Sequence, residues 1–151
     1  MSIQLKLRAE TADDLMVFSS ALQDAILRVG EIHYASKARS FTLRLSRFRH
    51  ESNVKAERVL CGLRFDGVMG VSSKGLKRDD PEAFAVLIAL TFNPHKAEPA
   101  GEIHLIFAGG GEIRLTVECI DAVLADVAEP KGTKSVPLHP LPLHDGDSSG
   151  S

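Results

Sequence analysis

Tryptophan is absent from this chain, and tyrosine and cysteine are nearly absent. The sequence holds one tyrosine and two cysteines, Cys61 and Cys119. Two cysteines are too few for a disulfide scaffold, and neither has a second cysteine or a histidine at the spacing of zinc sites. We therefore expect two reduced cysteines that pack in the core, no metal site and no cofactor.

Long hydrophobic runs and a strong excess of charge are also missing. The 18 basic and 20 acidic residues give a formal net charge of -2 at pH 7. No apolar run approaches the roughly 20 residues that cross a bilayer, and the first residues lack the apolar region of a signal peptide. These features predict a cytoplasmic protein with no membrane partner.

Enough apolar material is present for one domain. The chain has 151 residues, of which 44% are hydrophobic, so one compact core is the expected arrangement. The patterns predict a single α+β domain over residues 1–128, mainly antiparallel sheet with two helices. A disordered Pro-rich tail is expected over residues 129–151.

Two helix starts are visible. Thr11 can cap a helix that buries Leu15, Phe18 and Leu22 and ends near Gln23. Asp79-Asp80-Pro81-Glu82 combines an Asp cap, a proline at the first helical position and an acid in the first turn. The second helix is expected to bury three side chains, Phe84, Leu87 and Ile88.

Extended segments are indicated by alternating apolar residues. The segment 41–46 places Phe41, Leu43 and Leu45 on one face of a strand. Residues 25–29 fit either a strand or a last helical turn, and we favour the strand. Residues 119–127 also fit strand or helix, and here too we predict a strand.

The sharpest local prediction is a hairpin around Gly109-Gly110-Gly111. A three-residue glycine loop uses a left-handed position and would pair Phe107 with Ile113 and Leu105 with Leu115. The pair Ile103 and Val117 continues that ladder. His104, Ile106, Arg114 and Thr116 then share the opposite face.

The order of helix and strands recurs along the chain. Five positions in the first half (Leu63, Phe65, Asp66, Val68 and Val71) have the same spacing as five in the second (Leu115, Val117, Glu118, Ile120 and Val123). One interpretation is two related halves, 1–74 and 75–128, and the other is chance similarity between short motifs.

Three segments together resemble a known family: Leu22-Gln23-Asp24-Ala25, Gly62-Leu63-Arg64-Phe65-Asp66, and the glycine hairpin from Phe107 to Ile120. From about Leu5 to Val127 the chain resembles domain-of-unknown-function family 2948, known mainly from alphaproteobacteria. The resemblance implies a cytoplasmic bacterial protein. It brings no established activity, ligand or catalytic residue.

Basic residues are concentrated in the first half. Between Arg28 and Arg64 there are nine basic and three acidic residues. The first candidate site is therefore an Arg-rich strand and loop within residues 39–58 that could contact phosphates, formed by Arg44, Arg47, Arg49, Lys55 and Arg58. The alternative is a basic surface that pairs with acids of the same molecule.

A second candidate site is the polar face of the predicted hairpin. His104, Arg114, Thr116 and Glu118 would supply a proton-transfer group, a cation and a carboxylate. Cross-strand polar pairs are also the usual surface of a solvated sheet. We assign no catalytic residue.

These features favour a non-enzymatic binding or accessory module that recognises a protein partner or forms a homodimer. Sheet edges and the polar face are the expected contact surfaces. The alternatives are nucleic-acid binding through the Arg-rich segment and a small-molecule enzyme that uses the His104, Arg114 and Glu118 face.

Overall fold

The computed structural model describes residues 4–48 and 58–127 and shows one mainly antiparallel sheet with a single α-helix in those residues. The strands are β1 (Lys6–Ala9), β2 (Ala25–Arg28), β3 (Ile32–Ala35), β4 (Ser40–Phe48), β5 (Arg58–Phe65), β6 (Val68–Lys74), β7 (Phe84–Pro94), β8 (Gly101–Phe107), β9 (Glu112–Val117) and β10 (Ala122–Asp126). The helix is α1 (Ala12–Ala21), and two short 3-10 turns are η1 (Val29–Glu31) and η2 (Ala108–Gly110). No helix in these residues is long and apolar enough to span a membrane.

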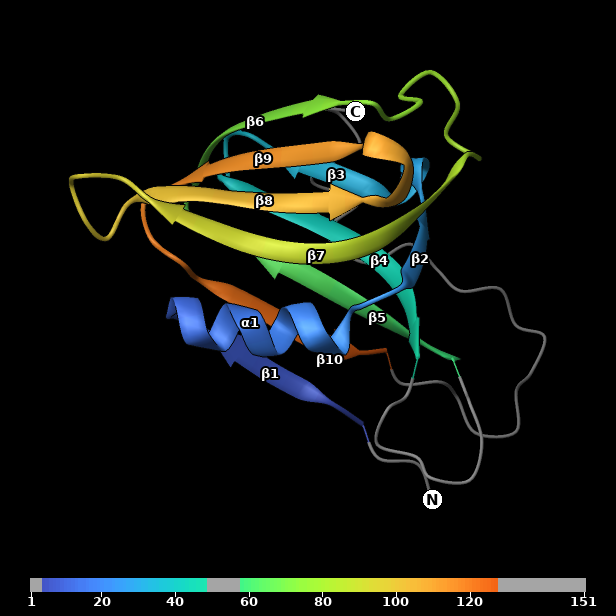
Figure 1. Ribbon diagram of the computed structural model, residues 1–151, viewed down its shortest axis with the longest axis horizontal. Coiled ribbons are helices and arrows are strands. Elements are labelled where there is room, and N and C mark those ends of the chain that lie inside the picture. Colours follow the sequence, from blue (N-terminus) through green and yellow to red (C-terminus); the bar gives the residue numbers. More distant parts are fainter. Residues whose placement is uncertain (1–3, 49–57, 128–151) are drawn as a thin grey trace.

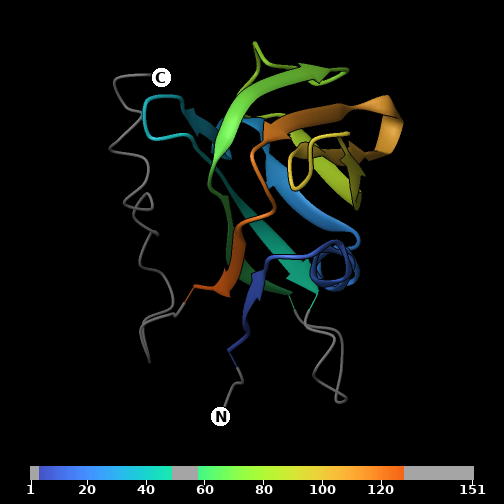
Figure 2. The same ribbon diagram turned by 90° about the vertical axis from the view of Figure 1, so that its left-hand side faces the viewer.

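The sheet is strongly curved, so that its two sides face each other across the core. Its strand order is β1-β10-β5-β4-β2-β7-β8-β9-β6, and β3 pairs with β4 beside this path. Figure 1 shows β6 to β9 on one side and β1, β4, β5 and β10 on the other, and the side view in Figure 2 shows the curvature. Apolar side chains of both sides form one buried core between them.

The first helix is confirmed. Thr11 accepts a hydrogen bond from the Asp14 amide, and the Asp14 carboxylate accepts one from the Thr11 amide, which completes a capping box. Leu15 and Phe18 are buried, and the helix packs against β7 and β1. Residues 25–28 form β2 and residues 122–126 form β10, so both choices of strand over helix are confirmed.

The second predicted helix is wrong. The Asp-Pro segment forms a turn, in which the Ala83 amide donates to the Asp80 carbonyl, and the chain then continues as β7. Leu87 is buried as expected, but Phe84 is 66% exposed and Ile88 is 42% exposed. The turn is followed by a strand because β7 pairs with β2 on one side and β8 on the other, and these ladders outweigh a local capping signal.

The glycine hairpin forms, but its register differs from the prediction. Leu105 pairs with Ile113 and Ile103 with Leu115, two residues away from the predicted partners. The Phe107 amide donates to the Gly111 carbonyl, so the hairpin closes at these residues and its three loop residues are 108–110, one position before the predicted loop 109–111. A shift of two residues preserves the faces, so the predicted buried face is confirmed: Ile103, Leu105, Phe107, Ile113, Leu115 and Val117.

Two strand-turn-strand segments cross between the two sides of the sheet. The chain passes from β5 to β6 and, next to it, from β9 to β10; the Asp66 amide donates to the Asp121 carbonyl and the Glu118 amide to the Gly67 carbonyl. The two halves expected from the sequence therefore exchange strands, with β10 on β5 and β6 on β9. Their duplication stays a prediction, and the expected tail lies outside the described residues.

Candidate functional site

The strand order ends in two edges of different character. β1 is four residues long and presents the exposed charged side chains Lys6 and Arg8, which oppose pairing with another strand. β6 is seven residues long and carries no charge before its last residue, Lys74, while Met69 is 50% exposed. β6 is therefore the edge that is open to a further strand.

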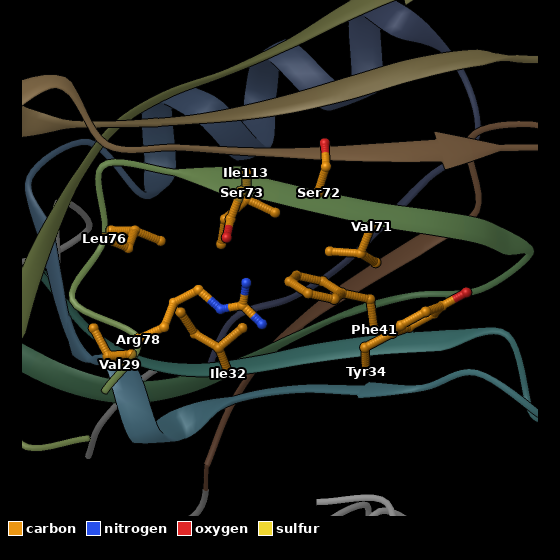
Figure 3. Close-up of a pocket in the computed structure, with 10 residues that line it drawn as sticks. All are labelled: Val29, Ile32, Tyr34, Phe41, Val71, Ser72, Ser73, Leu76, Arg78 and Ile113. Atoms are coloured by element: carbon orange, nitrogen blue, oxygen red, sulfur yellow. The ribbon is translucent and has the colours of Figure 1, made fainter. Parts of the chain in front are cut away.

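The free edge of β6, which pairs with no described strand, faces β3. β3 pairs only with β4 among the described strands, so it also has a free edge. The two edges are bridged at one end, where the Val68 amide donates to the Arg39 carbonyl at 2.9 Å and the Tyr34 hydroxyl donates to the Val68 carbonyl at 3.0 Å. Beyond this bridge the edges enclose a cavity (Figure 3).

We call this space the edge cavity; its volume is about 290 Å³. Six apolar side chains line it: Val29, Ile32, Phe41, Val71, Leu76 and Ile113. The polar lining consists of Tyr34, Ser72, Ser73 and Arg78. Small-molecule sites start at about 300 Å³, so a space of this size suits a few side chains of an extended segment better than a large cofactor.

Arg78 brings a positive charge to the edge cavity. Its side chain points into the space beside Ile32 and Phe41 in Figure 3. Within the described residues its guanidinium makes no ion pair, and the two acids that follow it, Asp79 and Asp80, do not line the cavity. An anionic group that enters the cavity would meet this cation.

The other face of the same edge carries a polar hollow, which we call the outer hollow. It is lined by Ser72, Ser73, Lys74, Glu112 and Arg114. Glu112 is the centre of its charges: its carboxylate lies 3.3 Å from His104 Nδ1, 3.1 Å from Arg114 Nε and 3.8 Å from Lys74 Nζ. One carboxylate therefore balances several cationic or protonatable groups.

The polar hairpin face is brought together only in part. His104 lies opposite Arg114 in the ladder, and Thr116 lies opposite Glu102. Glu118 leaves this group and forms an ion pair with Arg39 at 2.6 Å. The sequence interpretation missed Glu102 and Glu112, although both occupy alternate positions of the same strands and therefore share the face of His104.

His104 is held between two carboxylates. Its Nε2 lies 3.0 Å from Glu102 Oε1, and its Nδ1 faces Glu112. The hydrogen bond from His104 lowers the pKa of Glu102. Both ring nitrogens of His104 therefore face carboxylates of this network.

Arg47 is not a surface group, which corrects its place in the Arg-rich candidate site. Its side chain is 1% exposed and forms a two-pronged pair with the fully buried Asp126, with Nε to Oδ1 at 3.0 Å and Nη2 to Oδ2 at 2.9 Å. Asp126 also accepts the Leu5 amide at 2.8 Å. The alternation of inward and outward residues along β4 indicates this burial, because Arg47 continues the inward series of Leu43 and Leu45.

Of the remaining basic candidates, Arg44 and Arg58 lie within the described residues. Arg58 is exposed, but its guanidinium donates to the carbonyls of Ser46 and Asp24 and lies 4.0 Å from the centre of the Phe48 ring. Arg44 is half-buried on β4. Arg49 and Lys55 lie outside the described residues.

Both cysteines are free thiols. Cys61 is buried in the core on β5, and burial, with a smaller contribution from the nearby Asp126 carboxylate, raises its pKa to about 12 in spite of the opposing Arg47 charge. A thiol with so high a pKa is protonated at neutral pH, as expected of a packing residue. Cys119 is partly exposed.

The comparisons with known proteins identify a family and no function. Residues 5–139 match the family model described as Protein of unknown function (DUF2948). No curated protein and no solved structure matches the chain significantly. The match covers most of the sequence and agrees with the resemblance carried by the glycine hairpin. The chain therefore belongs to the DUF2948 family.

Proposed function

We propose that this chain is a non-enzymatic binding module that recognises a protein partner by pairing an extended segment of that partner with β6. The observation that carries the proposal is the open β6 edge, which carries no charge before Lys74 and lies beside the edge cavity. This combination gives a partner both backbone hydrogen bonds and a place for its side chains.

Backbone hydrogen bonds contribute binding free energy for partner segments of many different sequences. The outward N–H and C=O groups of an edge strand need partners, and a segment that runs along β6 would satisfy them and its own groups together. Apolar side chains that enter the edge cavity would add the burial of hydrophobic surface, at about 25 cal/mol per Å². A site of this kind selects by side-chain pockets placed at alternate positions.

The geometry favours this role over the enzymatic alternative. His104, the best acid or base of the hairpin face, has both ring nitrogens against carboxylates and lies on the outer face of the sheet. The apolar cavity lies on the inner side of β6, among the partners of the buried Leu115 and Ile113. The polar network and the cavity are therefore on opposite faces.

Hydrogen exchange with peptides selected from a phage-displayed linear library tests the proposal. A selected peptide is expected to slow exchange of backbone amides in residues 69–74 and 32–35 and to leave the other edge, residues 6–9, unchanged. Failure to select any peptide, or protection confined to a different surface, would contradict the proposal.

Two matched variants make the test specific. Ser73 lines the edge cavity, so Ser73→Leu fills space that a partner side chain needs and is expected to weaken peptide binding at least tenfold. Ser20→Leu adds the same side chain at an exposed position of α1 and is expected to have no effect. Equal affinities of the two variants would argue against the edge cavity.

The expected homodimer is a separate outcome of the same measurements. If the free chain sediments as a dimer and residues 69–74 are already protected without peptide, then β6 pairs with a second copy and the proposal of a different protein partner is wrong. A monomer with rapidly exchanging β6 amides supports the proposal.

A further inference from the structure

The two faces of β6 differ in chemistry, and this difference defines what a partner segment should look like. Val71 and Ser73 pair with the buried Leu115 and Ile113 and so belong to the inner face. Ser72 and Lys74 pair with Arg114 and Glu112 on the outer face. A strand that runs beside β6 would place successive side chains alternately on these two faces.

The inner face accepts apolar side chains. Residues of η1, β3, β4, β6 and β9, with Leu76 beyond β6, close the edge cavity with aliphatic and aromatic groups. Six of the ten lining residues are apolar, so a charged side chain placed there would lose hydration and find polar partners only at Tyr34, Ser72, Ser73 and Arg78. Apolar residues are therefore expected at every second position of the segment.

The outer hollow next to β6 is lined by two permanent cations and one carboxylate, and the second carboxylate of this face, Glu102 on β8, lies against His104. Lys74 and Arg114 both lie within ion-pair distance of Glu112, so one carboxylate serves two permanent cations, and His104 shares it. The Lys74 side chain is 69% exposed, and its ammonium lies as far as 3.8 Å from the Glu112 carboxylate. The ammonium is therefore accessible to a second carboxylate. Arg78 adds a cation without an acidic partner among the described residues, at the cavity lining.

From these two faces we infer that the partner segment of the proposed binding site alternates apolar and acidic residues. The inference rests on the proposed function, because it assumes a segment paired with β6. The apolar residues fill the edge cavity, and the acidic residues meet Lys74 and Arg114 of the outer hollow. The charges also predict an affinity that falls as the salt concentration rises.

Three synthetic octapeptides, acetylated and amidated, test the inference by fluorescence anisotropy. One alternates valine and glutamate, one valine and lysine, and one serine and glutamate. The valine and glutamate peptide is expected to bind at least tenfold more tightly than either of the others, because only it matches both faces. Equal binding of all three would overturn the inference.

Charge reversal on β6 provides the matched test. Lys74→Glu is expected to weaken binding of the valine and glutamate peptide at least tenfold and to strengthen binding of the valine and lysine peptide. Lys6→Glu, an equal change at an exposed position of β1, is expected to alter neither. Because both lysines are exposed, the two variants are expected to fold, which thermal unfolding verifies.

The possible failures are distinguishable. If the valine and lysine peptide binds best and still protects residues 69–74 from hydrogen exchange, then the inferred chemistry is wrong and the proposed edge binding stands. If none of these peptides binds and no library peptide protects β6, both the inference and the proposed function are wrong. Protection of β6 by the valine and glutamate peptide, lost in Lys74→Glu, is the result we expect.

Discussion

At the residue scale, the buried pair of Arg47 and Asp126 connects strands that do not touch in the sheet. Arg47 lies on β4 and Asp126 on β10, and both strands flank β5. The two-pronged contact crosses β5 on the inner face. There Cys61 of β5 lies opposite Asp126 on β10 and opposite Leu45 on β4. An arginine that seemed suited to bind phosphate therefore holds one side of the sheet together.

Removing one partner of this pair is expected to be costly. Arg47→Met leaves the Asp126 carboxylate buried without its cation, and loss of one partner of a buried pair lowers the free energy of unfolding by about 3–5 kcal/mol. The exposed pair of Arg64 and Asp66 supplies the comparison, because Arg64→Met is expected to cost about 0–1 kcal/mol. Urea unfolding of the two variants measures both values.

A double variant separates the value of the pair from the penalty of an unpaired charge. Arg47→Met combined with Asp126→Leu removes both charges and is expected to be more stable than Arg47→Met alone. If Arg47→Met is as stable as the unmodified chain, the pair does not hold these strands.

This pair also shows what the residue pattern could reveal. Alternation placed Phe41, Leu43 and Leu45 on one face correctly, and Arg47 is the next member of that series. We predicted Arg47 at the surface because it is charged, although its position in the alternation is inward. Asp126 likewise continues the buried series of Ala122 and Leu124, but its pairing with Arg47 depends on a strand order that the sequence does not display.

At the element scale, local signals predicted the elements that local interactions stabilise. The capping box at Thr11 and the buried Leu15 and Phe18 define α1, and both are visible in the sequence. The segment that begins at Asp79 has an equally strong pattern for a helix N-terminus. The chain nevertheless continues as the strand β7, because β7 forms backbone hydrogen bonds with β2 and β8. Pairing with distant strands is the contribution that a local pattern omits.

The glycine hairpin is the element where backbone conformation is decisive. Gly109 and Gly110 have φ angles of 82° and 96°, and no atom would lie within 4 Å of an added Cβ at either position. The prediction of left-handed glycines was therefore right. The pairing prediction failed because the three-residue loop is Ala108–Gly110, one residue earlier than the three glycines, which moves each cross-strand partner by two residues.

A pair of glycine variants tests this account of the hairpin. Gly109→Ala places a Cβ on a left-handed residue and is expected to lower the free energy of unfolding by about 1–2 kcal/mol. Gly70→Ala in β6 has open space and no left-handed φ angle, so it is expected to cause no loss of stability. Thermal unfolding compares them, and an equal effect of both substitutions would contradict the conformational explanation.

At the scale of the whole molecule, the sheet order determines where a partner can bind. The crossings between β5 and β6 and between β9 and β10 leave β1 and β6 as the terminal strands. The sequence favoured sheet edges as contact surfaces but gave no reason to choose one, because the choice depends on which strands end the order. Once the order is known, the charges of β1 and the uncharged stretch of β6 separate the two edges.

The edge cavity illustrates the same limit. Its lining comes from residues as far apart in the chain as Val29 and Ile113. Arg114 was a candidate for contact in the sequence, yet the combination of an apolar inner face and cations on the outer face arises only when β6 lies beside β9 and faces β3. Family membership was recognisable from the hairpin residues, whereas the site was not.

The most direct test of the central claim is an NMR measurement of the chain with the valine and glutamate octapeptide. Cross-strand nuclear Overhauser effects between backbone protons of the peptide and those of residues 69–74 are predicted, with peptide valine methyl groups close to Phe41 and Ile113. Contacts of the peptide with β1 or α1 instead, or a bound peptide without regular backbone contacts to β6, would contradict the account.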